Sequence, residues 1–130
     1  MIAVILASGR LERLYTGLSL LVSTASAGEP ARGLATFEAL GPLLDDSLAT
    51  RALLTEETPS LSPSGRAIFA RTLAELRDAA AELPDCQIWA CAAAVETTGA
   101  ERADVEARLH GVLSTPRFLR ETAGARLVVV

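Results

Sequence analysis

The chain of 130 residues has the length of one domain, because a single core usually takes roughly 50 to 250 residues. Half of the residues are hydrophobic and 22% are charged, which excludes a disordered chain. The formal net charge is −4 and the basic residues, all of them arginine, are scattered singly, so we expect neither a nucleic-acid partner nor lysine-dependent catalysis.

The first quarter of the chain has the pattern of a strand and a helix. Residues 1–7 form a continuous aliphatic run that stops at Ser8 and Gly9, as in a strand buried on both faces of a parallel sheet. Apolar side chains then recur at spacings of three and four from Leu11 to Ala25, which predicts a helix that ends near Gly28.

The next segment contains a weaker strand and a long polar stretch. We expect a strand over residues 33–37 and a brief apolar helix over 38–44. Residues 45–62 carry two pairs of acidic residues and repeated serines without a sustained apolar period, which predicts a long exposed excursion. Such an excursion can be a lid or a solvated insertion, and the sequence leaves both readings open.

The second half of the chain alternates helices and strands. Ser62 and Pro63 predict the start of a helix that runs to Leu83, and residues 86–91 form a short strand that passes directly into a helix from Ala92. Further helical turns are expected over 101–109 and from a cap at Thr115 to about residue 123, before a final strand over 127–130. This alternation predicts an α/β fold in one domain, 1–130, built as a three-layer α/β/α sandwich around a mostly parallel sheet of about five strands.

Cys91 is the first candidate for chemistry. A residue that ends a parallel strand and opens a helix lies at the carboxyl edge of the sheet, where such folds bind ligands. The backbone N–H groups of the helix from Ala92 would favour the thiolate form of this cysteine, while a packed, unreactive thiol is the alternative. Cys86 lies five residues earlier on the same strand, so their Cα atoms are about 16 Å apart and beyond disulfide reach; we expect Cys86 to fill the core.

Ser8 and Gly9 form a second candidate, since a small turn ahead of a helix can present backbone N–H groups to an anion. A plain tight turn is the alternative, because a single glycine completes neither a dinucleotide nor a phosphate-loop motif. His110 is the single histidine and no residue pattern links it to a nucleophile or a metal ligand set, so we expect no metal and no cofactor.

No segment has the pattern of a membrane span or of a secretory signal. No apolar run approaches the roughly 20 residues that span a bilayer, which predicts no membrane partner. The apolar run 2–7 precedes the basic residues and Glu12 interrupts them, unlike the order of a secretory signal, so we expect a cytoplasmic protein.

The sequence resembles the DsrE/DsrF/TusD-like family of sulfur-relay proteins over nearly its whole length. The resemblance rests on residues 87–99 around Cys91, on Gly111 and 117–130, on the first strand 3–9 with the helix after it, and on the strand exit at Phe37 and Glu38. The residues after Cys91 are plain alanines where relatives have polar or methionine side chains, and residues 45–62 do not align with the family.

The resemblance implies that Cys91 carries a persulfide between a sulfur donor and an acceptor protein, without metal or cofactor. It also implies a homo-oligomer (a dimer, trimer or hexamer). For a substrate pocket at the same edge of the sheet, the residues we predict are Ser8, Gly9, Phe37 and Ala92. Two other readings remain open. The domain can be a non-catalytic small-ligand-binding or interaction module, in which Cys91 is only packed and Ser8 and Gly9 form a pocket with the 45–62 segment. It can also be a redox sensor that forms a disulfide between subunits through Cys91 or Cys86.

Overall fold

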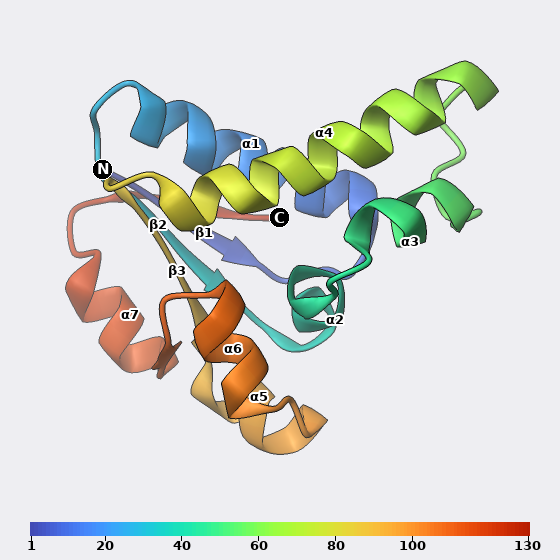
Figure 1. Cartoon of the computed structure of the whole chain (residues 1–130). Helices are drawn as coiled ribbons and strands as arrows, with labels where there is room; N and C mark the ends of the chain where they lie inside the picture. The colour runs from blue at the N-terminus through green and yellow to red at the C-terminus, as the bar shows by residue number, and fades with distance from the viewer.

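The computed structural model of the chain describes all 130 residues and shows a five-stranded sheet in the order β4-β3-β2-β1-β5 (Figure 1). Every neighbouring pair of strands is parallel, so the predicted α/β fold is confirmed and the sheet is entirely parallel. The strands are β1 (Ile2–Leu6), β2 (Ala31–Ala35), β3 (Cys86–Cys91), β4 (Val112–Leu113) and β5 (Arg126–Val129).

Seven helices and one short 3-10 turn surround the sheet. They are α1 (Leu11–Ser26), η1 (Phe37–Ala39), α2 (Leu40–Leu44), α3 (Leu48–Leu54), α4 (Pro63–Glu82), α5 (Ala92–Thr98), α6 (Arg102–Arg108) and α7 (Thr115–Glu121). In Figure 1, α1 and α4 lie side by side above the sheet, α7 lies below it, and α2 and α5 gather near the carboxyl ends of the strands. None of these helices has both the length and the hydropathy that crossing a membrane requires.

Alternation along the strands sorts side chains between the two faces of the sheet. Val4, Gly33 and Ile88 are in register on the face covered by α1, where a Cβ on Gly33 would lie 3.1 Å from the Leu21 side chain. Trp89 points to the other face and packs edge-on against Phe118 of α7, with ring centroids 6.3 Å apart. Both faces of the central strands are therefore covered, which explains the continuous aliphatic run of β1.

The cover is incomplete over β5, which forms one edge of the sheet. Leu127 and Val129 are in register with Ala3 and Ile5 on the face of α7, yet they are 51% and 64% exposed. A seven-residue helix is too short to shield all the strands of this face. The molecule thus has exposed apolar side chains along the edge strand β5.

The helices α4 and α7 both begin with a serine cap followed by a proline in the first turn, but the cap of α7 lies one residue earlier than predicted. The Ser62 hydroxyl accepts the Gly65 N–H at 3.0 Å ahead of Pro63, as expected for α4. At α7 the capping residue is Ser114, whose hydroxyl accepts from an N–H in the first turn, so the predicted cap at Thr115 was wrong by one residue.

Three segments differ from the sequence predictions. The second strand lies at Ala31–Ala35 rather than 33–37, because it pairs with β1 from Ile2 onward. Residues 45–62 are not one long loop, since α3 forms within them and buries Leu48 and Ala52. The two-residue strand β4 was not predicted at all.

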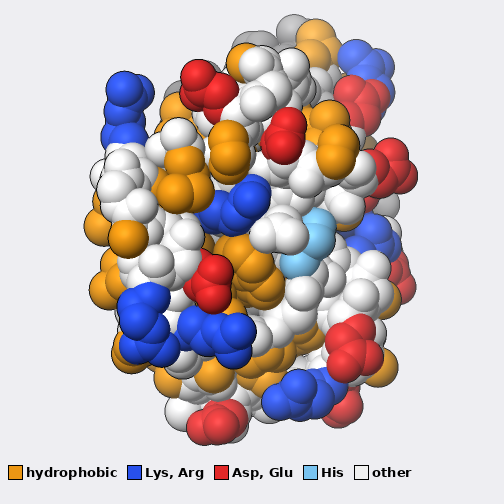
Figure 2. Space-filling view, turned by 90° about the vertical axis from the view of Figure 1, so that its left-hand side faces the viewer, with side chains coloured by type: hydrophobic (Ala, Val, Ile, Leu, Met, Phe, Trp, Pro, Cys, Tyr) orange, Lys and Arg blue, Asp and Glu red, His pale blue; other side chains and the backbone are white.

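The His110 imidazole extends the contact between β3 and the segment that leads into β4. Its Nδ1 accepts the Ile88 N–H at 3.0 Å, while the backbone N–H of His110 donates to the Ile88 carbonyl at 2.8 Å. A side-chain nitrogen thereby takes the position of a strand carbonyl. Figure 2 looks onto the amino-terminal ends of the strands, where His110 is the one pale blue side chain and arginines alternate with acidic residues around apolar atoms.

Candidate functional site

Cys91 ends β3 and is the N-cap residue of α5, which is the junction predicted from the sequence. Its side chain accepts no hydrogen bond from the N–H groups of α5, so the expected contact between sulfur and helix backbone is not formed. The polar neighbour of the sulfur is instead the Thr115 hydroxyl in the first turn of α7, with 3.8 Å between Sγ and Oγ1. Since Cys91 has the same side-chain direction as Trp89, it faces α7.

Cys91 is buried, with 5% of its surface exposed. It lines none of the cavities of the molecule. A reaction at this sulfur therefore requires movement of a neighbouring segment. The residues of the first turn of α7, from Ser114 to Arg117, are exposed and include the Thr115 hydroxyl that contacts the sulfur.

Cys86 lies at the opposite edge of the sheet in the core, 1% exposed, as predicted. Burial raises the pKa of its thiol from the usual 9.0 to about 11, and the nearby Arg32 opposes this shift. The Arg32 guanidinium donates to the carbonyls of Ala31 and Asp85 and so closes the amino edge of the sheet. Both cysteines are free thiols.

Ser8 and Gly9 form the turn after β1, which leads into α1 and packs closely against η1. The Ser8 hydroxyl accepts the Arg10 N–H at 3.1 Å and so stabilises the turn into α1. A Cβ on Gly9 would lie 2.8 Å from the Glu38 carbonyl oxygen, which shows how closely this turn approaches η1. Gly9 also lines a cavity of about 650 Å³, whereas Ser8 does not.

Phe37 and Ala92 lie apart from that cavity. Phe37 leaves β2 with a φ of +38°, an unfavourable backbone region for a bulky residue, and its ring is 51% exposed. It lines a second cavity of about 500 Å³ between α2 and the turn from α5 to α6. Ala92 is half-buried and lines neither space. The four predicted pocket residues thus share the carboxyl edge but do not form one pocket.

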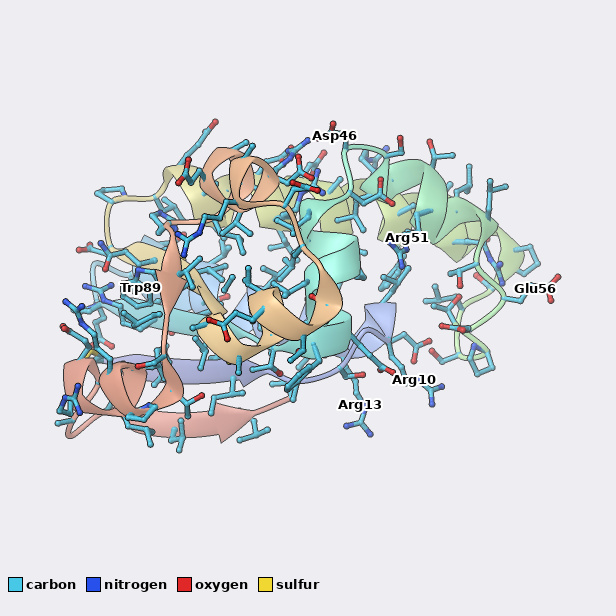
Figure 3. All side chains as sticks on the ribbon, turned by 90° about the horizontal axis from the view of Figure 1, so that it is seen from below. Arg10, Arg13, Asp46, Arg51, Glu56 and Trp89 are labelled. Atoms are coloured by element: carbon cyan, nitrogen blue, oxygen red, sulfur yellow. The ribbon has the colours of Figure 1, made fainter.

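The larger cavity is made by residues that the sequence did not single out as a group. Its lining comes from the β1–α1 turn, η1, α3 and the segment before α4. Five of the seven lining residues are charged: Gly9, Arg10, Glu38, Arg51, Glu56, Glu57 and Pro59. Figure 3 shows Arg10 and Arg51 on either side of the arrowhead of β1, with Glu56 farther out on the segment before α4. In the sequence, the adjacent acidic residues 56 and 57 were the one feature that could have pointed to this cavity. Their position across from Gly9 depends on the tertiary fold.

The segment that closes this cavity is held at two points. The Ser60 hydroxyl donates to Glu12 of α1 at 2.5 Å, and the Arg66 guanidinium of α4 donates to the Thr55 carbonyl. Thr58 lies between these points, fully buried. The predicted excursion is therefore anchored on both sides where it borders the cavity.

The carboxyl edge thus contains a buried thiol beside a hydroxyl and, separately, an open cavity with charges of both signs. No group of three or more histidine, cysteine or acidic side chains is placed to hold a metal ion. Comparison of the sequence with protein-family models and with curated proteins finds no match. The resemblance to the sulfur-relay family therefore stays a prediction that rests on the residues quoted above.

Proposed function

We propose that the protein is a sulfur carrier that acts through Cys91. The observation that carries this proposal is the placement of Cys91 at the carboxyl end of a parallel strand, with its sulfur 3.8 Å from the Thr115 hydroxyl. Ligand sites of open parallel sheets lie at this edge. A hydroxyl that donates to sulfur stabilises the thiolate and its persulfide, because both are anionic acceptors.

The proposed step is a thiol exchange that needs no oxidant. The Cys91 thiolate attacks the outer sulfur of a donor persulfide, the donor S–S bond breaks, and the donor leaves as a thiolate. Cys91 then carries the persulfide until an acceptor thiolate attacks the outer sulfur and regenerates the Cys91 thiolate. Because Cys91 is buried, the first turn of α7 has to move away from the sulfur before either partner can react.

The test is intact-protein mass spectrometry after incubation with a low-molecular-weight persulfide. Wild type is expected to gain one sulfur atom and Cys91→Ser none. Cys86→Ser is expected to gain one sulfur atom as well, because it lacks only the cysteine that fills the core. A donor-competent control protein must be modified in parallel. Loss of the extra sulfur in Cys86→Ser rather than Cys91→Ser, or an unmodified wild type, overturns the proposal.

A second candidate function is a small-ligand-binding module in which Cys91 is only packed. The observation in its favour is the contrast between Cys91, which is 5% exposed and lines no cavity, and Gly9, which lines the largest one. In this reading the β1–α1 turn and part of the 45–62 segment form the site.

We also propose that the protein self-associates in the cytoplasm, where its two free thiols would stay reduced. The support is the β5 edge. The N–H groups of Arg126 and Val130 donate to β1, so those of Leu127 and Val129 point outward from the sheet. An exposed edge with apolar side chains is a template for pairing with another strand. Light scattering is expected to show more than one chain per particle, and Val129→Lys to reduce that number.

A further inference from the structure

The cavity beside Gly9 has the properties of a preformed binding site. Its volume of about 650 Å³ lies within the range of roughly 300 to 1,000 Å³ that small-molecule sites occupy. Its wall is fixed by the bonds from Ser60 to Glu12 and from Arg66 to Thr55, and its floor by the close approach of Gly9 to Glu38. The space therefore does not depend on a ligand to form it.

The charges on the lining are mostly free to meet a ligand. Arg10 forms no salt bridge, and neither do Glu38, Glu56 and Glu57. Arg51 has one ionic contact, to Asp45 at 3.3 Å, which leaves other guanidinium N–H groups available. The site thus offers cations from the β1–α1 turn and α3, and carboxylates from η1 and the segment before α4.

This combination excludes several classes of ligand. An apolar molecule would meet five charged residues in the lining and one apolar side chain, that of Pro59. A polyanion would be repelled by three carboxylates, and a metal ion is disfavoured because the acidic side chains do not converge as a ligand set. A ligand with one anionic and one cationic group matches both signs.

We propose that this cavity binds a small zwitterion of amino-acid or short-peptide size. Its carboxylate pairs with Arg10 and Arg51, since guanidinium groups recognise carboxylates with two N–H donors. Its ammonium group pairs with the carboxylates on the other side, at Glu38, Glu56 or Glu57. The inference rests on the ligand-binding part of the second candidate function, and it holds whether or not Cys91 carries sulfur, because Cys91 does not line this cavity.

The test uses three matched probes: triglycine, N-acetyltriglycine, which keeps only the carboxylate, and triglycinamide, which keeps only the ammonium group. Binding is measured by titration calorimetry and by shifts of the Gly9 amide resonance. Triglycine is expected to bind at least about tenfold more tightly than either blocked probe, which is the weight of one hydrogen bond to a charged group. Equal binding of a blocked probe, or no saturable binding of triglycine, overturns the inference.

Variants locate the site. Arg10→Gln is expected to weaken triglycine binding at least about tenfold, because Arg10 is exposed and its loss removes a ligand contact without opening the core. The matched control is Arg13→Gln, three residues later in the first turn of α1, exposed but outside the lining (Figure 3). An equal loss in both variants overturns the site. Cys91→Ser is expected to bind triglycine as wild type does, so failure here and failure of sulfur transfer are separate results.

Discussion

Cys86 and Cys91 lie at opposite ends of the same strand, and their surroundings differ. At the amino end, Cys86 is packed in the core and the Arg32 guanidinium satisfies nearby carbonyls. At the carboxyl end, Cys91 lies beside a hydroxyl under an exposed helical turn, close to the strand exits that line two cavities. The same residue type thus has a packing role at one end of β3 and a proposed chemical role at the other. The two roles follow from the position of each cysteine, at the amino or the carboxyl edge of the sheet, because the residue type is the same.

Alkylation of the native protein should show the largest difference between Cys86 and Cys91. At pH 8 a thiol with a pKa of about 11 is ionised about 100-fold less than one with the usual 9.0, so Cys86 should react about 100-fold more slowly than an ordinary thiol. We expect iodoacetamide to label Cys91 before Cys86, at the rate at which the first turn of α7 moves away from the sulfur, as measured by peptide mapping. The denatured chain should show equal labelling of both cysteines. Equal labelling in the native protein would show that the two ends do not differ.

The raised pKa of Cys86 also predicts a loss of stability in alkali. The folded state keeps this proton up to about pH 11 and the unfolded state only to about 9.0, so the contribution is complete below pH 9 and disappears as the pH rises through 11. The expected loss is roughly 2 to 3 kcal/mol in the free energy of unfolding, measured by urea denaturation at a series of pH values. Cys86→Ala should lack this component, and parallel curves for the two proteins would contradict the prediction.

Gly9 and Gly28 lie in turns at the two edges of the sheet, and they differ in how closely other atoms approach them. Gly9→Ala at the carboxyl edge would bring a Cβ within 2.8 Å of a backbone oxygen, and we expect a loss of about 1 to 3 kcal/mol. Gly28→Ala, in the turn that leads to the amino edge, meets open space but has a φ of +81°, which predicts a loss of about 1 kcal/mol. Urea denaturation measures both. A Gly9→Ala protein as stable as wild type would show that the turn after β1 can move away from η1.

The smallest expected effect concerns Asp46, in the turn between α2 and α3. The Arg108 guanidinium, 2.5 Å from its carboxylate, lowers the pKa of Asp46 below the usual 3.8. This contribution to stability is therefore present above about pH 4 and lost as the pH falls through the lower folded-state value. Acid titration of Arg108→Gln should show a shallower decline than wild type. Superimposable acid titrations would show that this exposed pair contributes nothing, as many surface pairs do.

Much of the fold could be predicted because strong local patterns agree with the tertiary structure. The aliphatic run of β1, the three-and-four spacing of α1 and the Ser62–Pro63 start of α4 each specify an element without reference to the rest of the chain. The helix α3 escaped prediction because only Leu48 and Ala52 are buried, too few for a period. Strand β4 is two residues long and depends on β3 and His110 for its position.

The candidate site was less predictable than the fold. The position of Cys91 followed from the strand–helix junction, but its burial depends on α7, which comes more than twenty residues later in the chain. The charged cavity depends on the packing of α3 and the segment before α4 across from Gly9. In the sequence, Arg51, Glu56 and Glu57 have only the spacing of solvated side chains, so their convergence could not be inferred.

The position of β1 in the sheet has a consequence for how the chain folds. This first strand is paired on one side with β2 and on the other with β5, the last strand. During synthesis β1 therefore keeps one side without hydrogen-bond partners until β5, at Arg126–Val129, has left the ribosome. Contacts between such distant segments slow folding and leave an apolar strand open to wrong pairing in the meantime. A nascent chain that stalls before β5 would expose the edge of a strand that is almost entirely buried in the folded protein.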